Sequence, residues 1–175
     1  MKVLNLPRQH QTYGYDCGAA VLEIVLAYYG IELREELVMK RAGTTINGTP
    51  IKGIVDTAAK LGLKCASKAM TIDEVKKYLD RKIPVILLLQ AWTGKKKINW
   101  EKDWADGHYV IAIGYNREKV IFEDPYSFKL TYLKYDELEQ RWHDIDSKGR
   151  RYVHHCIAIQ GRKPEFSKNR IIHMD

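Results

Sequence analysis

The sequence predicts an α+β fold, with helices concentrated in the first half of the chain and strands in the second. Up to about residue 81, apolar residues recur at helical spacing between capping signals. From Pro84 onward, short apolar runs alternate with turn residues. The chain has 175 residues, 45% of them apolar, which suits one hydrophobic core. We therefore expect a single domain over 1–175, with a loosely held polar tail from about residue 163.

The first element, from Cys17 to Tyr29, is expected to be the central helix of the domain. It is apolar around nearly its whole circumference, and Glu23 carries its only charge. Helices with this pattern are normally buried on all sides. Gly30 is a natural end for the helix, because glycine readily adopts the left-handed conformation that follows many helices.

Three further helices and one strand are expected before residue 84, at about 33–41, 50–61 and 71–81 for the helices and 63–68 for the strand. Thr49 is a candidate N-cap of the second of these helices, with Pro50 at its first helical position. Thr71 and Glu74 have the spacing of a capping box, which indicates the start of the third.

Four buried strands follow, in the segments PVILLLQAW, HYVIAIGY, KVIFEDP and YVHHCIAIQ. A helix around 135–142 precedes the last of them. The second and third segments are separated by a very short connection, so we expect them to form an antiparallel hairpin.

The length of the hairpin loop decides whether His108 and Asp124 meet. With a three-residue loop, Tyr115 lies opposite Lys119. The same register places Val110 opposite Asp124, so that His108 becomes its diagonal neighbour on one face of the sheet. A two-residue loop would shift the register by one and put the two side chains on opposite faces. The prediction therefore requires the three-residue loop.

Cys17 lies at the N-terminal end of the expected central helix. This position stabilises the reactive thiolate, and Gly18 leaves room for a substrate backbone to approach. The alternative is that Cys17 is a small apolar core residue. A nucleophile needs a base and an orienting group, for which His108 and Asp124 are the candidates. Asp124 has an alternative role as a turn residue before a proline.

Gln11 carries a side-chain amide six residues before Cys17. Acyl transfer develops negative charge on the carbonyl oxygen, which must meet hydrogen-bond donors that are already in place. The amide of Gln11 and the backbone N–H of Cys17 are candidates for this oxyanion hole.

In this order, Gln11, the DCG step into the apolar helix, GHYVIAIGY and EDPY resemble the C39 peptidase family of papain-like cysteine proteases. The resemblance spans roughly residues 6–160. It implies a papain-like fold, in which an N-terminal helical part with the central helix is followed by an antiparallel sheet. It also implies a nucleophile at Cys17, a general base at His108, an orienting group at Asp124 and an oxyanion donor at Gln11.

Some members of that family are fused to ABC transporters and cut leader peptides after a double glycine. This sequence contains neither a transmembrane nor a nucleotide-binding segment, so we expect a stand-alone C39-like protein. Its expected reaction is cleavage of a peptide or amide bond in a peptide or protein substrate, through an acyl-enzyme thioester and without a cofactor. Two alternatives are a thiol-dependent acyltransferase with the same site and a peptide-binding module without turnover.

The loop at 93–107 leads directly to His108 and carries Trp100 and Trp104. One interpretation is that the two indoles form an apolar wall for substrate, while the neighbouring lysines favour an acidic peptide. The alternative is a solvated loop that its tryptophans anchor to the core.

The remaining composition argues against several other classes of protein. The net charge of +7 comes from short clusters mixed with acids, so we expect a solvated surface and no nucleic-acid partner. Adjacent histidines at 154 and 155 would point to opposite faces of a strand, and no second ligand pair appears, so no metal site is expected.

Three cysteines without a CxxC pair indicate free thiols. With no signal peptide and no apolar run of membrane-spanning length, we expect a cytoplasmic protein. The oligomeric state is left open.

Overall fold

A computed structural model describes residues 3–162 and residue 173. Its helices are α1 (Cys17–Tyr28), α2 (Glu35–Ala42), α3 (Ile51–Lys60), α4 (Ile72–Asp80) and α5 (Tyr135–Arg141). Its strands are β1 (Lys64–Ala69), β2 (Val85–Gln90), β3 (Gly107–Tyr115), β4 (Lys119–Glu123), β5 (Thr131–Lys134), β6 (His143–Ile145), β7 (Arg151–Val153) and β8 (His155–Gln160). The predicted α+β class is confirmed.

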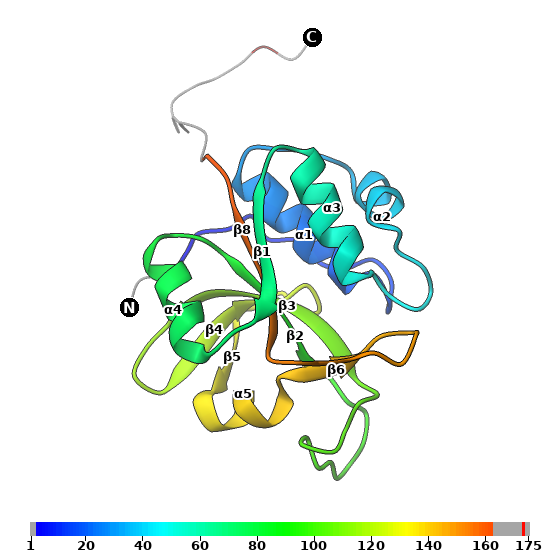
Figure 1. Ribbon diagram of the computed structural model, residues 1–175, viewed down its shortest axis with the longest axis vertical. Coiled ribbons are helices and arrows are strands. Elements are labelled where there is room, and N and C mark those ends of the chain that lie inside the picture. Colours follow the sequence, from blue (N-terminus) through cyan, green and yellow to red (C-terminus); the bar gives the residue numbers. More distant parts are fainter. Residues whose placement is uncertain (1–2, 163–172, 174–175) are drawn as a thin grey trace.

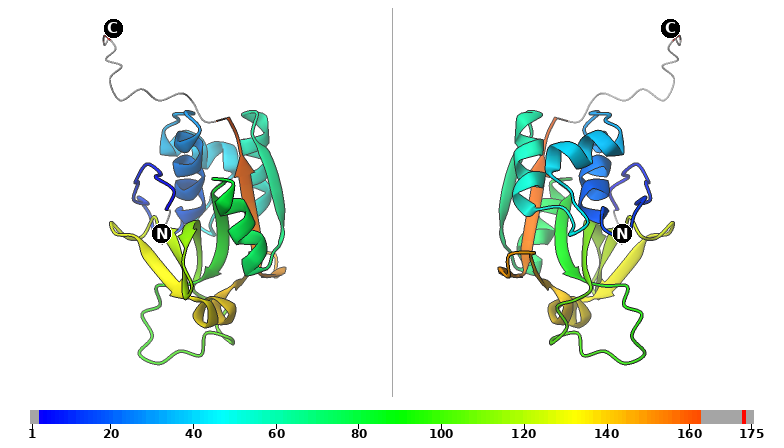
Figure 2. Two further views of the ribbon diagram at one scale, coloured as in Figure 1. Left: turned by 90° about the vertical axis from the view of Figure 1, so that its left-hand side faces the viewer. Right: turned by 90° about the vertical axis from the view of Figure 1, so that its right-hand side faces the viewer.

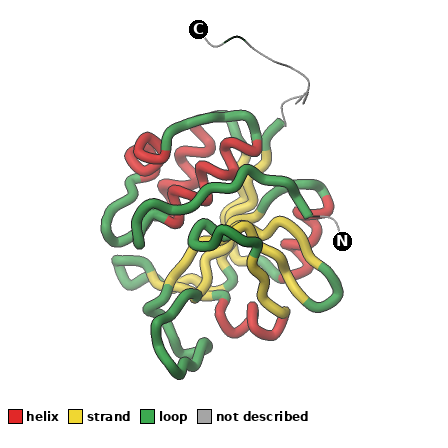
Figure 3. The backbone as a smooth tube through the Cα atoms, turned by 180° about the vertical axis from the view of Figure 1, so that it is seen from behind, coloured by secondary structure: helices red, strands yellow, loops and turns green. Residues whose placement is uncertain are grey.

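A six-stranded antiparallel sheet, in the order β1-β8-β2-β3-β4-β5, forms the centre of the described chain (Figure 1). The first three helices gather on one side of the molecule, and α5 lies on the opposite side (Figure 3). The connection between β2 and β3 projects away from the sheet (Figure 2). A separate two-stranded ribbon consists of β6 and β7.

Two hydrophobic clusters fill the space on the two faces of the sheet. Ile86 and Leu88 of β2 belong to the cluster formed with α1. Leu87 and Leu89, which point the other way, belong to the cluster formed with α4 and α5. This explains the continuous apolar run of β2 from Val85 to Leu89, since helices cover both faces of the sheet.

The central helix ends where the sequence predicts. All of α1 from Gly18 to Leu26 is buried, and Gly30 follows it with a left-handed φ of 77°. The capping box of α4 between Thr71 and Glu74 is also confirmed. The predicted start of α3 is wrong by one residue. Pro50 is the N-cap, because its extended ψ of 140° leaves it outside the helix.

The turn between β3 and β4 differs from the prediction. Tyr115 lies opposite Val120 rather than opposite Lys119. The N–H of Asn116 donates to the carbonyl of Lys119 at 3.0 Å, so these two residues pair and leave a two-residue loop between them. The loop is therefore one residue shorter than expected. The Asn116 side chain closes this turn by accepting hydrogen bonds from the backbone N–H groups of Glu118 and Lys119.

A β-bulge at Ile113 restores the predicted register farther along the hairpin. Beyond the bulge, Ile111 lies opposite Glu123, as a three-residue loop would have placed them. One strand contributes an extra residue at a bulge, which offsets the one-residue shift of the short turn. His108 and Asp124 therefore meet as predicted, although the premise about the loop was wrong.

The last predicted strand is also divided in two. His154 has a left-handed φ of 54° and separates β7 from β8. Two short strands, β5 and β6, were not predicted. The polar tail expected from about residue 163 lies outside the described residues except for residue 173.

The packing of α2 against α3 yields a prediction. A Cβ at Gly53 would lie 1.8 Å from the carbonyl oxygen of Ala42, at the end of α2. We expect Gly53→Ala to destabilise the protein by about 1–3 kcal/mol, because backbone atoms must move. Thermal unfolding of this variant and of Gly94→Ala, whose added methyl meets nothing within 4 Å, checks the expectation. Equal melting temperatures for the two variants would contradict it.

Candidate active site

His108 and Asp124 form a buried hydrogen-bonded pair at the end of the β3–β4 hairpin. Nε2 of His108 lies 2.7 Å from Oδ1 of Asp124. The two residues are only 6% and 2% exposed. Water therefore competes little for this hydrogen bond, which fixes the orientation of the imidazole ring.

Asp124 is held by three further donors. Its Oδ2 accepts hydrogen bonds from the Trp92 indole at 2.9 Å and from the Thr131 hydroxyl at 3.4 Å. Its Oδ1 also accepts from the backbone N–H of Tyr126. Burial acts to raise the pKa of Asp124, but His108 and the N–H donors of Tyr126 and Trp92 hold it below its usual value. The carboxylate is thus ionised at neutral pH.

The side chain of Cys17 is the second group that acts on the imidazole of His108. Burial acts to lower the pKa of His108. Hydrogen bonds to Asp124 and Cys17, together with the charges of both partners, outweigh this effect and raise the pKa to about 9. His108 therefore interacts with both the carboxylate of Asp124 and the sulfur of Cys17.

Cys17 is the first residue of α1 and is partly exposed. The loop before it is closed by Asp16, whose Oδ2 accepts hydrogen bonds from the backbone N–H groups of Thr12 and Tyr13 at 3.1 and 2.9 Å. This leaves the sulfur at the N-terminal end of a buried helix, where unpaired N–H groups and the helix dipole favour an anion.

Gln11 lies on the same loop and is tied to the neighbourhood of Asp124. Its backbone N–H donates to the carbonyl of Pro125 at 2.8 Å. Its side-chain Nε2 donates to the carbonyl of Tyr13 at 2.7 Å, and Gln11 is 8% exposed. The structure thus brings together the four residues that the sequence motifs singled out, from three separate segments.

Gly18 requires a correction. A Cβ at this position would lie 2.6 Å from Cβ of Thr49 and 3.0 Å from the ring of Tyr109. The missing side chain therefore makes room for core packing between α1 and these two residues. It does not make room for a substrate backbone, as the sequence analysis expected.

Trp100 and Trp104 anchor the β2–β3 connection. The Arg141 guanidinium lies 4.0 Å from the centre of the Trp100 ring. Trp104 packs against His143, with ring centroids 4.4 Å apart, and beneath Arg151. These contacts favour the anchoring alternative over an apolar wall for substrate. Lys95 of the same loop pairs with Asp103 and Asp106.

Two aromatic residues beside Asp124 were not predicted from the sequence. Trp92 donates to the Asp124 carboxylate from a left-handed backbone conformation with φ of 58°, which is uncommon for a residue with a side chain. Tyr126 packs on Trp92 at 4.8 Å and points its edge toward His108 at 6.4 Å. Neither residue stands out in the sequence, because Trp92 only ends an apolar run and Tyr126 only follows a proline.

The other two cysteines differ from Cys17. Burial raises the pKa of the Cys65 thiol and raises that of Cys156 well above its usual value, so both are protonated at neutral pH. Over residues 3–162 and 173, no cluster of three or more His, Cys, Asp or Glu side chains has the arrangement of a metal site. In the same range, no helix has the length and apolar character needed to cross a membrane.

Comparison with known proteins gives a family match that includes most of the described chain. The model of the Peptidase C39 family matches residues 5–145. An uncharacterized protein of Methanothermobacter thermautotrophicus is 31% identical over 121 residues, which cover 69% of this chain and 72% of that protein. The colicin V secretion/processing ATP-binding protein CvaB of Escherichia coli is 22% identical over 135 residues, or 77% of this chain. The chain matches only 17% of the length of CvaB.

A solved structure agrees with this match. The peptidase domain of Streptococcus ComA, a bi-functional ABC transporter involved in a quorum sensing pathway, aligns with a TM-score of 0.65 and 26% identity. The alignment covers 91% of this chain and 99% of that domain. From the extent of the family match and this shared fold, we conclude that the chain belongs to the C39 peptidase family of cysteine peptidases.

Proposed function

We propose that this protein hydrolyses peptide bonds through a thioester on Cys17, with His108 as general base and acid and Asp124 as the group that orients His108. The observation that supports this most strongly is the buried hydrogen bond of His108 to the carboxylate of Asp124, together with the influence of Cys17 on the pKa of the same imidazole. This is the arrangement that an activated thiol nucleophile requires.

The proposed reaction has two steps. In the first, the Cys17 thiolate attacks the carbonyl carbon, and the proton on His108 passes to the leaving nitrogen as the C–N bond breaks. In the second, His108 takes a proton from water, and the resulting hydroxide attacks the thioester and releases Cys17 as the thiolate. Because the pKa of His108 is about 9, the proton for the amine is present at neutral pH.

Gln11 and the backbone N–H of Cys17 are the proposed donors to the oxyanion. A side-chain amide carries two hydrogens, and the Tyr13 carbonyl takes one of them. The second is then available to the developing charge. The N–H of Cys17 belongs to the first helical turn, where backbone donors lack partners within the helix.

The proposed substrate is a peptide or protein, in line with the processing function that the name of CvaB records for that relative. We also propose a cytoplasmic location. All three cysteines are free thiols, which is the usual state in a reducing compartment.

Replacement of Cys17 tests the nucleophile directly. We expect Cys17→Ala to abolish peptide cleavage, measured by mass spectrometry on a mixture of synthetic peptides. Cys65→Ala is the matched control and should retain cleavage, because Cys65 lies on β1, packs against α3 and is absent from the site. Cleavage by Cys17→Ala at the wild-type rate would refute the proposal.

Replacement of Gln11 tests the oxyanion hole. With a peptide that the wild-type protein cleaves, Gln11→Ala should lower kcat by about 10²–10³-fold. Gln11→Glu has nearly the same size but an ionised carboxylate cannot donate, so a similar loss is expected. Retention of activity by Gln11→Glu would show that the side chain acts through packing alone.

The pH dependence of kcat/KM tests the role of Asp124. Activity should fall as the pH rises through about 9, because His108 then loses the proton that the leaving amine needs. Asp124→Asn removes the negative charge that helps to raise the pKa of His108, so the alkaline fall should begin at lower pH. An alkaline limb at the same pH in both proteins would contradict this role.

A further inference from the structure

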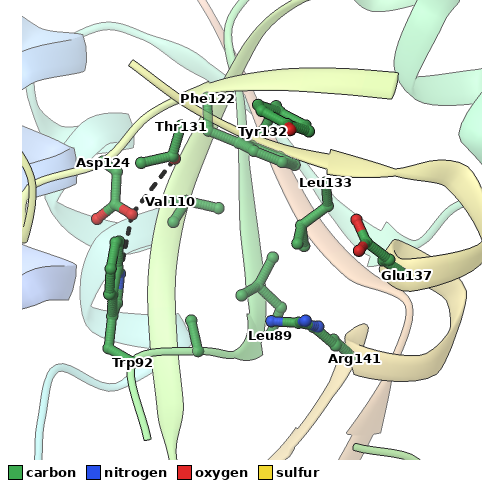
Figure 4. A pocket seen from close by; sticks show the side chains of 11 residues that line it. Leu89, Trp92, Val110, Phe122, Asp124, Thr131, Tyr132, Leu133, Glu137 and Arg141 are labelled. Carbon is green, nitrogen blue, oxygen red and sulfur yellow. Dashed lines mark hydrogen bonds between the residues drawn. The ribbon is translucent and has the colours of Figure 1, made fainter. Parts of the chain in front are cut away.

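A cavity of about 300 Å³ is bordered by Asp124 (Figure 4). It is bounded by residues of β2, β3, β4, β5 and α5, on the face of the sheet opposite α1. This volume is at the lower end of the range for small-molecule sites. The cavity takes no part in the proposed reaction, and its occupant would bind whether or not Cys17 is active.

The cavity has an apolar body between two polar ends. Its walls are the side chains of Leu89, Val110, Phe122 and Leu133. At one end, Asp124 has its carboxylate engaged by Trp92 and Thr131. At the other end, the Arg141 guanidinium points into the cavity (Figure 4).

Arg141 forms no ion pair within the described part of the chain, although the Glu137 carboxylate one turn earlier on α5 acts on it electrostatically. None of the ion pairs within 4.0 Å among residues 3–162 and 173 includes it. Its Nε is buried without a hydrogen-bond partner in the same range. The ring of Trp100 covers one face of the guanidinium at 4.0 Å. The neighbouring carboxylate of Glu137 instead accepts the backbone N–H of Lys134 at 2.9 Å and caps α5.

A partly buried guanidinium without a direct hydrogen-bond partner at Nε is costly, since arginine remains charged in proteins. A carboxylate satisfies it best, because the planar N–H groups match the two carboxylate oxygens. Because the walls next to Arg141 are apolar, we expect the ligand to carry an apolar group on that carboxylate.

We propose that this cavity binds a carboxylate joined to an apolar group of about the size of a leucine side chain, with the carboxylate on Arg141 and the apolar group between Val110 and Leu133. The C-terminal residue of a peptide and a free branched carboxylic acid share this chemistry. Because Trp92 and Thr131 both line the cavity and hold Asp124, the ligand contacts the supports of the proposed catalytic carboxylate.

The indole N–H signals of the four tryptophans provide the test. In ¹⁵N-labelled Cys17→Ala protein, which cannot turn over a peptide by the proposed route, N-acetyl-leucine should shift the Trp92 and Trp100 signals saturably. Trp92 lines the cavity and Trp100 stacks on Arg141, whereas Trp104 does neither, so the Trp104 signal should stay in place. N-acetyl-leucinamide lacks the charge and should bind at least about tenfold more weakly.

Arg141→Gln, made in the same background, should weaken N-acetyl-leucine by a similar factor. Arg151→Gln is the matched control, since Arg151 also stacks on a tryptophan but lies outside the cavity. Tighter binding of acetyl-Gly-Gly-Leu than of 4-methylpentanoate would assign the site to a peptide C-terminus, and the reverse would assign it to a free acid.

Equal affinity for the acid and the amide would overturn the proposal, even if Arg141→Gln failed to fold. So would the absence of saturable shifts at Trp92 and Trp100. Because binding is read without turnover, these results are independent of whether Cys17 is the nucleophile.

Discussion

The hydrogen bond between His108 and Asp124 is the contact on which the arrangement of the whole site depends. It joins two strands across a hairpin, so it exists only in one register. That register results from two opposite deviations, a tight turn at one end and a bulge at Ile113 near the middle. The carbonyl of Ile113 accepts the backbone N–H of Leu4 at 2.8 Å, so the N-terminal segment pairs with the bulged residue. The bulge is thus an integrated part of the fold.

The same N-terminal segment connects the helical side of the molecule to the hairpin. After Leu4 it passes Asp124, where Gln11 bonds to the Pro125 carbonyl and the His10 ring lies 3.0 Å from the carbonyl of Tyr126. It then enters α1 at Cys17. Backbone hydrogen bonds thereby fix the loop before Cys17 relative to Asp124. One N-terminal segment thus links the helix that carries Cys17 to the hairpin that carries His108 and leads to Asp124.

The raised pKa of His108 also links the site to stability. Folding raises this pKa from 6.5 to about 9, so the folded state binds the proton more tightly than the unfolded state does. The resulting stabilisation is fully present below pH 6.5 and is lost as the pH rises through 9. Asp124 has the opposite pH dependence, because folding lowers its pKa. Its contribution to stability is present above the ordinary pKa of an aspartate and is lost as the pH falls through the lowered pKa.

The class of the fold was predictable from the sequence, because apolar periodicity and strand alternation are local properties. The meeting of His108 with Asp124 was predicted from a three-residue loop, and it occurs because the bulge at Ile113 offsets the shorter turn. The short turn and the bulge were not predictable, since the side chain of Asn116 and a distant pairing with Leu4 determine them. The role of Gly18 was misjudged for a similar reason, as Thr49 fills the space beside it from a different segment. The contact of Trp92 with Asp124 was not predictable either, because the two residues lie 32 positions apart in the sequence.

The central claim is that Asp124 and Cys17 together raise the pKa of His108 and so keep its ring charged at neutral pH. An NMR titration of the His108 ring in the wild-type protein and in Cys17→Ala measures this most directly. The account predicts a pKa of about 9 in the wild-type protein and a lower value in the variant, where Asp124 alone opposes the effect of burial. An identical pKa in the two proteins would show that the sulfur and the imidazole do not interact, and would contradict the account.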